Sequence, residues 1–511
     1  MSAVSRRPSA VPAFFVNQVI ENYAAKSSTP ISLKHMINFG NAGRNKGEKE
    51  EADKLLKGGN FLRTELPTRL SHRLRDLQEL PLGVASHPRI THVYEMYLEA
   101  FDQVRKFPVI SDMDDNDRFC EFMRKTLDKH RVVIPELAIG IAESSPTQLP
   151  PAALDRIMLR MLRSRISRRV ITEQHLALTA QFRERQRKGK GRETTNGGGE
   201  TRVGIVDTKL NAADVVRKCA ELIKALGGPE SEVPIVIEGA TERTFAYISE
   251  HLEFMLFELI KNAAHATISA HGVEAAAAHP TVVTIVHRPR DLEVRVSDQG
   301  GGIPPYGGLP PDPDDLSASN PLLSPTALAA PLSAQRLDIF SFSHMRRYYQ
   351  HHAALAAAAA TPASRSSPPS PLTIPIVESA QSAPSTSTSS SSPPPPPPPP
   401  PSSSSSSSLS SAAAVAATNA SAPKGIMALH DVNELAGTVQ EQLERRQQRR
   451  LGNDDGHGAE RELIDAQMRS GIGLPLSKMY AEYFSGSLDI YTIQGYGSDA
   501  FLRIPKFGTA S

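Results

Sequence analysis

Residues 249–304 constrain the fold more than any other stretch of this 511-residue chain. They begin SEHLEFMLFELIKNAAHATISAHG, in which apolar residues recur every three or four positions. This spacing predicts an amphipathic helix with the apolar stripe Leu252, Met255, Leu256, Leu259, Ile260 and Ala263. Glu258 and Asn262 lie one turn apart on the opposite flank, where a carboxylate and a carboxamide can share a ligand. Alternation predicts two strands at 281–287 and 292–297, and the second ends at Asp298 before three glycines.

Each of these parts also has an ordinary structural explanation. A glutamate with an asparagine four positions later is usually a solvated helix face, and an aspartate before glycines is usually a turn. The order of the parts is more specific: E-x-x-x-N on a helix, a hairpin, D-x-G-x-G, and later the glycine motif at 471–473 that opens a helix. A helix that begins at such a motif offers free N–H groups and its positive dipole end to phosphate. The combination predicts a nucleotide site.

These motifs resemble the ATP-binding domain shared by gyrase, heat-shock chaperones, histidine kinases and MutL, the GHKL superfamily. Within it, the chain resembles the mitochondrial protein kinases of 2-oxoacid dehydrogenase complexes, which include pyruvate dehydrogenase kinases and branched-chain 2-oxoacid dehydrogenase kinases. The resemblance rests on ELIKNAAHAT (258–267), VSDQGGGIP (296–304), GIGLPLSKMYAEYFSGSLDIYTIQGYGSDAFLRI (471–504), FLRTELPTRLSHR (61–73) and SRISRRVITEQHLAL (164–178).

The residue chemistry and the resemblance give the same roles. Asn262 offers a neutral oxygen to Mg²⁺, which binds few protein ligands directly. Glu258 is placed to orient or deprotonate the attacking hydroxyl, and Asp298 can accept a hydrogen bond from the adenine amino group. The glycines are expected to leave room for the purine (300, 302) and to bring backbone amides to phosphate (471, 473). The other predicted nucleotide-binding residues are His265, Gly300, Gly302, Gly471, Ile472, Gly473, Leu474 and Ser498.

Three departures from the family pattern bear on function. Phe254 stands where pyruvate dehydrogenase kinases commonly carry a histidine, although branched-chain kinases have an aromatic residue there. His265 replaces the usual arginine, which weakens one charged contact near the site. The chain has no tryptophan, so it lacks the Asp-Trp tail motif of many animal pyruvate dehydrogenase kinases. Lipoyl-domain docking that depends on that tail must work differently here.

The fold class predicted is α + α/β. Helical spacing at 68–80, 92–105, 117–138 and 151–179 predicts an N-terminal four-helix bundle at 31–182. A charged, glycine-rich linker is expected at 183–203, followed by a GHKL-type α/β sandwich at 204–511. Strands at 235–238, 281–287, 292–297, 487–493 and 499–504 would form its mixed sheet. Residues 353–423, rich in alanine, serine and proline, predict a disordered insertion in the ATP lid.

His175 needs separate consideration, because histidine kinases phosphorylate a histidine on a helical bundle. An acidic residue normally follows that histidine, whereas Leu176 follows here. We therefore predict that His175 is packed or faces a partner and is not a phosphoacceptor.

Composition excludes several classes. A net charge of +2 demands no nucleic-acid partner, and Cys120 and Cys219 suit a reducing compartment. No apolar run approaches the roughly 18–20 residues of a bilayer span, so no membrane insertion is expected. The first twenty residues contain Arg6, Arg7, several serines and no acid, which predicts a mitochondrial transit peptide at 1–30. A disordered basic tail has the same composition.

The expected function is that of a mitochondrial-matrix protein serine/threonine kinase that uses ATP and Mg²⁺. The resemblance implies that it phosphorylates and inactivates the E1 subunit of a 2-oxoacid dehydrogenase complex, with pyruvate dehydrogenase as the preferred target. The branched-chain complex is the alternative. Expected partners are E1, a lipoyl-bearing E2 and a second copy in a homodimer. An ATP-driven chaperone or mismatch-repair-type ATPase, which the N-terminal bundle argues against, and a pseudokinase scaffold remain as other classes.

Overall fold

In the computed structural model, the described residues are 18–44, 47–189, 201–303, 337–347, 350 and 473–506. The first seventeen residues, the predicted insertion 353–423, and Gly471 and Ile472 lie outside them. Among the residues that the structure describes, no helix combines the length and apolar character needed to span a bilayer.

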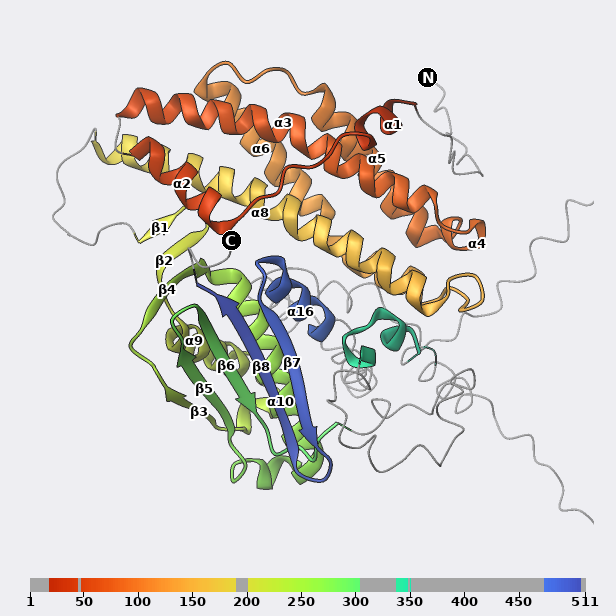
Figure 1. Cartoon of the computed structure of the whole chain (residues 1–511), viewed down its shortest axis with the longest axis vertical. Helices are drawn as coiled ribbons and strands as arrows, with labels where there is room; N and C mark the ends of the chain where they lie inside the picture. The colour runs from red at the N-terminus through yellow and green to blue at the C-terminus, as the bar shows by residue number, and fades with distance from the viewer. Residues whose placement is uncertain are drawn as a thin grey trace, which may run out of the picture. The chain divides into compact units, whose positions relative to one another are not determined.

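The first part of the chain is helical (Figure 1). Its helices are α1 (Gln18–Ala24), α2 (Leu33–Arg44), α3 (Glu48–Gln78), α4 (Leu82–Ala85), α5 (Pro88–Lys106), α6 (Met113–Lys129), η1 (His130–Val132), α7 (Val133–Ala142) and α8 (Pro151–Gly189). The helices α3, α5, α6 and α8 are the longest, and α3 packs against the other three. The four predicted helical stretches are all helical, but α3 begins well before residue 68 and the third stretch is divided between α6, η1 and α7.

The end of the predicted transit segment, residues 18–30, lies within the described part of the structure. Helix α1 packs against α3, and its Ile20 is fully buried. Beyond it, the backbone N–H of Thr29 donates to Oε1 of Glu65 at 2.8 Å. Helix α1 and Thr29, which fall within the predicted transit segment, therefore contact the helical part of the structure.

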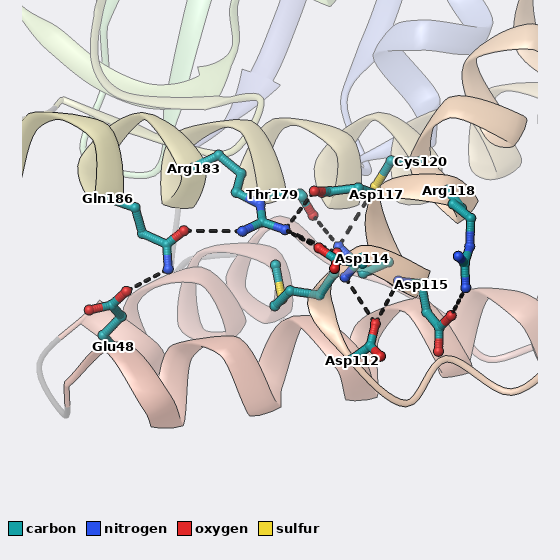
Figure 2. Close-up of polar contacts among 12 residues, drawn as sticks. Glu48, Asp112, Asp114, Asp115, Asp117, Arg118, Cys120, Thr179, Arg183 and Gln186 are labelled. Atoms are coloured by element: carbon teal, nitrogen blue, oxygen red, sulfur yellow. Dashed lines mark hydrogen bonds and ion pairs between the residues drawn. The ribbon is translucent and has the colours of Figure 1, made fainter. Parts of the chain in front are cut away.

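The boundary predicted between bundle and linker, at residue 183, falls too early, because α8 continues to Gly189. Polar contacts hold its last turns to α6 and α3, as Figure 2 shows. Arg183 forms an ion pair with Asp117 at 2.6 Å, and Gln186 donates to Glu48. Residues 183–189 have the composition of a linker, but Arg183, Arg185 and Gln186 bond to acidic residues of these neighbouring helices, and the segment is helical.

His175 is packed, as predicted. It is 4% exposed, and its Nε2 lies 2.9 Å from Oδ1 of Asn116 on α6. Burial lowers the pKa of His175 to about 4, so the ring is neutral near pH 7. The side chain therefore joins α8 to α6 inside the helical part.

The second part of the chain contains a five-stranded mixed sheet in the order β3-β5-β6-β8-β7. Its strands are β3 (Ile235–Gly239), β5 (Thr281–His287), β6 (Asp291–Ser297), β8 (Gly497–Pro505) and β7 (Ser487–Ile493), so all five predicted strands are confirmed. Strands β3 and β5 are parallel and the other pairs are antiparallel. The helices α9 (Ala212–Leu226) and α10 (Ser249–Ala276) pack on the sheet (Figure 1). Alternate residues of β6 are buried, as the sequence alternation predicts.

A small antiparallel sheet, not predicted, precedes α10. It has the order β1-β2-β4 and consists of β1 (Arg202–Val203), β2 (Val206–Asn211) and β4 (Thr244–Ile248). Strand β4 runs directly into α10, so this sheet fixes the position at which the central helix starts. β1 has only two residues and β2 carries several polar ones, which leaves little alternation for a sequence pattern to detect.

Candidate nucleotide-binding site

Helix α10 is buried on more than one face. Its predicted apolar stripe is buried, and Glu258 on the other flank is 0% exposed. Helix α16 (Gly473–Tyr483), which follows the second glycine motif, packs against α10. The explanation of Glu258 as part of a solvated face is therefore wrong. A carboxylate buried to this extent is energetically costly unless it is paired or hydrogen-bonded.

One oxygen of Glu258 has a partner and the other does not. Oε1 accepts a hydrogen bond from Nζ of Lys261 at 3.0 Å, and this pair is shielded because the Lys261 side chain is only 13% exposed. Oε2 is buried and has no hydrogen-bond partner among the described residues. Lys261 was not among the predicted site residues, although its i+3 spacing from Glu258 on a helix is a recognisable signal. The arrangement holds a carboxylate in place with one oxygen left to accept a proton or a hydrogen bond.

Gly473 explains how the second glycine motif reaches this carboxylate. A Cβ on Gly473 would overlap Oε2 of Glu258, so a larger residue at this position would displace the carboxylate or the first turn of α16. The N-terminal end of α16, with its free N–H groups, therefore lies beside Glu258. Two predicted members of this motif, Gly471 and Ile472, are outside the described residues.

A cavity of about 240 Å³ lies next to this pair. Six predicted residues line it, namely Asn262, His265, Asp298, Gly302, Leu474 and Ser498. Three other predicted residues do not line it: Glu258 and Gly473, which face each other, and Gly300. Asn262 is one turn after Glu258 on α10, so the cavity and the buried carboxylate share one helix. The structure thus brings residues from α10, the end of β6, α16 and β8 into one place, although together they span more than 200 positions of the sequence.

Asp298 is held by backbone groups at the end of β6. Its Oδ1 accepts hydrogen bonds from the N–H groups of Gly300 at 2.8 Å and of Ser498 at 3.2 Å. No hydrogen bond between described residues uses Oδ2, which leaves this atom for a ligand in the cavity. Burial raises the pKa of Asp298 above its ordinary value, and the two backbone hydrogen bonds oppose that shift.

Thr492 positions Ser498, and it was not among the predicted site residues. Its Oγ1 accepts from the N–H of Ile303 at 2.8 Å and lies 2.9 Å from Oγ of Ser498. It also lies 3.1 Å from the carbonyl oxygen of Gly497, to which it can donate. Thr492 and Ser498 are directly paired between β7 and β8, so the register of the predicted hairpin is the signal that identifies Thr492.

Of the three glycines after Asp298, Gly300 and Gly302 were predicted to belong to the site, and each is glycine for a different structural reason. A Cβ on Gly300 would overlap Ala266 of α10, so this glycine lets the turn pack closely on the helix. Gly302 lines the cavity and has a φ of +78°, a conformation that side chains other than glycine rarely adopt.

Two departures noted in the sequence have defined surroundings. His265 lies at the cavity with its Nδ1 3.5 Å from Oε1 of Glu230, and its side chain is 40% exposed. Phe254 is 5% exposed, with its ring centre 5.2 Å from that of Tyr480 on α16. Phe254 thus strengthens the packing of α10 on α16 one turn before Glu258 and is not part of the cavity lining.

The side chains near the cavity would suit a metal ion that is held mainly by the phosphates of a bound nucleotide. No group of three or more histidine, cysteine, aspartate or glutamate side chains in the described part of the chain is arranged to bind a metal ion. Asn262 supplies one neutral oxygen at the cavity, which suits Mg²⁺ bound to phosphates and to few protein groups.

Fold and cavity together define a two-part protein, in which a helical part precedes a mixed-sheet part that carries a ligand cavity beside its central helix. Residues 30–207 match the family model described as mitochondrial branched-chain alpha-ketoacid dehydrogenase kinase. The chain is 28% identical over 304 residues to pyruvate dehydrogenase (acetyl-transferring) kinase 2, mitochondrial, of Saccharomyces cerevisiae, which covers 56% of this chain and 57% of that protein. It is 30% identical to the mitochondrial pyruvate dehydrogenase kinase of Arabidopsis thaliana, over 57% of this chain and 74% of that protein. It is also 30% identical to isozyme 3 of Homo sapiens, over 57% and 70%.

The chain belongs to the family of mitochondrial 2-oxoacid dehydrogenase kinases. The match to the family model spans the helical part from α2 onward and the start of the small sheet. The alignment with the yeast relative spans a little over half of that protein's length.

Proposed function

We propose that this chain is a protein serine/threonine kinase of the mitochondrial matrix, which transfers phosphate from ATP to the E1 subunit of pyruvate dehydrogenase and so inactivates it. The observation that carries the proposal is the buried carboxylate of Glu258, which has one oxygen bonded to Lys261 and one without a partner among the described residues. It lies beside the N-terminus of α16 and one turn from the cavity residue Asn262. The names of the relatives from yeast, Arabidopsis and human support pyruvate dehydrogenase as the target.

In this proposal each residue has one task in the transfer. Asp298 would accept from the adenine amino group through Oδ2, while the backbone hydrogen bonds to Oδ1 keep the carboxylate in place. Mg²⁺, held through the oxygen of Asn262, would neutralise charge on the phosphates. Oε2 of Glu258 would accept the proton of the attacking serine hydroxyl, while Lys261 fixes the orientation of the carboxylate through Oε1.

The finer classification of the fold belongs to the same proposal. We assign α3, α5, α6 and α8 to a four-helix bundle, since they are long and α3 packs against the other three. We assign the mixed sheet with α9, α10 and α16 to the GHKL superfamily. Order along the chain supports this assignment. Glu258, Asp298 and Gly473 occur in that order; Asp298 lines the cavity, and Glu258 and Gly473 face each other next to it.

A lipoyl-bearing E2 and a second copy of the chain are the other proposed partners. The absence of tryptophan means that E2 docking would not use an Asp-Trp tail. The matrix location is supported by the mitochondrial names of the relatives. A fluorescent protein fused after residue 30 should enter mitochondria, and retention in the cytosol would contradict this location.

The test is phosphotransfer by the purified full chain with Mg-ATP and, in separate reactions, the E1 of the pyruvate and of the branched-chain complex. Phosphoserine is quantified by mass spectrometry and E1 activity is measured in parallel. Phosphorylation of pyruvate dehydrogenase E1 alone supports the proposal. Phosphorylation of branched-chain E1 alone would support the alternative, which the description of the matched family model favours. ATP binding without phosphorylation of either E1 would contradict kinase activity and favour an ATPase or a scaffold.

A further inference from the structure

One wall of the cavity is formed by residues 337–347, shown in teal in Figure 1. Ile339, His344 and Met345 of this segment line the cavity together with α10 and β6 residues. The segment also contacts α16, because Nζ of Lys478 lies 4.5 Å from the ring centre of Phe340. Its position therefore affects the shape of the space that a ligand would occupy.

The helical turns at 342–347 are capped by a residue from the other part of the chain. Oδ1 of Asp155 on α8 accepts from the N–H groups of Phe342 at 2.7 Å and Ser343 at 3.0 Å. Oδ2 of Asp155 accepts from Oγ of Ser343 at 2.8 Å. The next N–H, that of His344, donates to Oγ of Ser341 at 3.0 Å. The first three N–H groups of the helix are thus satisfied, two of them by a carboxylate that lies 187 and 188 positions earlier.

Further contacts attach the same segment to the connection between α7 and α8. Arg346 is 1% exposed, and its Nη1 donates to the carbonyl oxygen of Leu149 at 2.8 Å. Nε2 of Gln350 donates to the carbonyl oxygen of Ser144 at 3.3 Å. A buried guanidinium favours a nearby negative charge, and Asp155 supplies it. The wall is therefore held by the helical part, while the rest of the cavity lining comes from the sheet part and α16.

We propose that Asp155 is a positioning residue for the nucleotide site, which acts by fixing the wall formed by Ile339, His344 and Met345. It touches no cavity atom itself, and it couples the start of α8 to nucleotide affinity through the cap of the 342–347 helix. This inference rests on the proposed function, in which the cavity holds ATP.

The test compares Asp155→Ala with Asp112→Ala in the full chain. Asp112 is a matched control because its Oδ1 also caps a helix of the N-terminal part, accepting from the N–H groups of Asp114 at 3.0 Å and Asp115 at 2.8 Å, as Figure 2 shows. Both variants lose a helix cap, so both should lower the melting temperature. Only Asp155→Ala should weaken Mg-ATP binding in calorimetry, by about tenfold, which is the size of one lost cap expressed as a binding constant. KM for ATP should rise accordingly, with kcat changed less than threefold.

A conservative variant separates positioning from general stability. Asp155→Asn keeps an oxygen at Oδ1 to accept from Phe342 and Ser343, so its affinity for Mg-ATP should return to within about threefold of wild type. If Asp155→Ala does not fold, Ser343→Ala removes one of the three hydrogen bonds and should weaken binding by about threefold. Binding by the Asp155→Ala variant, or by Ser343→Ala in its place, that equals wild type within experimental error would overturn the inference. Wild-type protein that binds no ATP would instead remove the proposed function, and this inference with it.

Discussion

Replacement of Glu258 by glutamine tests the chemical step. The neutral side chain has nearly the same shape, and its oxygen can still accept from Lys261, but it cannot take the proton of a serine hydroxyl. Loss of a positioned general base typically slows a reaction by about 10²–10⁴-fold. Since Glu258 is not among the residues that line the cavity, the affinity for Mg-ATP should stay within a few-fold of wild type.

The Glu258→Gln variant should lose less stability than a variant that removes the side chain. Glutamine retains the hydrogen bond to Lys261, so we expect a loss of about 1–3 kcal/mol in the free energy of unfolding. Glu258→Ala would leave the shielded Lys261 cation without its partner, for which the expected loss is about 3–5 kcal/mol. Glutamine is therefore the variant to use in the kinetic assay.

Glu253→Gln is the matched control. Glu253 is also a buried glutamate of α10, at 5% exposure, and it pairs with Lys218 at 2.7 Å, but it does not line the cavity. Single-turnover phosphotransfer to E1 and calorimetric ATP binding should be measured for both variants. Phosphotransfer by Glu258→Gln within tenfold of wild type would falsify the assignment of Glu258 as the base. A similar slowing of Glu253→Gln would show that the effect comes from a disturbed helix.

Three further outcomes follow from the site. Asn262→Ala should abolish the gain in ATP affinity that Mg²⁺ gives, and calorimetry with and without the ion checks this; an unchanged gain would exclude Asn262 as a ligand. Protonation removes the acceptor at Asp298, and its pKa is raised by burial. As the pH is lowered, ATP affinity should therefore begin to fall above pH 3.8, which is the ordinary pKa of aspartate. Asp298→Asn should remove this fall and relax the preference for ATP over GTP. Thr492→Val removes the hydrogen bonds of Oγ1 with Ile303, Gly497 and Ser498, so chemical denaturation should show a loss of about 1–3 kcal/mol. Equal stability would contradict the structural role of Thr492.

The sequence by itself determined the elements that have a strong local period. The three- and four-residue spacing of α10 gave its buried stripe, and the alternation of the five sheet strands gave their positions within one or two residues. The order of the glutamate, asparagine, aspartate and glycine motifs also indicated which residues gather at the cavity. These features depend on neighbours in the chain, so their pattern is present in the sequence itself.

Tertiary structure decided everything that depends on contacts between distant segments. Periodicity places Glu258 on the polar flank of α10, whereas the tertiary structure buries the carboxylate and packs Gly473 against it. Residues 183–189 have a linker composition, but they form the end of α8, where α3 and α6 supply acidic partners for Arg183, Arg185 and Gln186. In the sequence, nothing distinguishes Asp155 from an ordinary aspartate near the start of a helix. Its role depends on the fold, which brings Phe342 next to it. A contact between residues 187 positions apart produces no repeating pattern in the local sequence, so it becomes visible only in the folded structure.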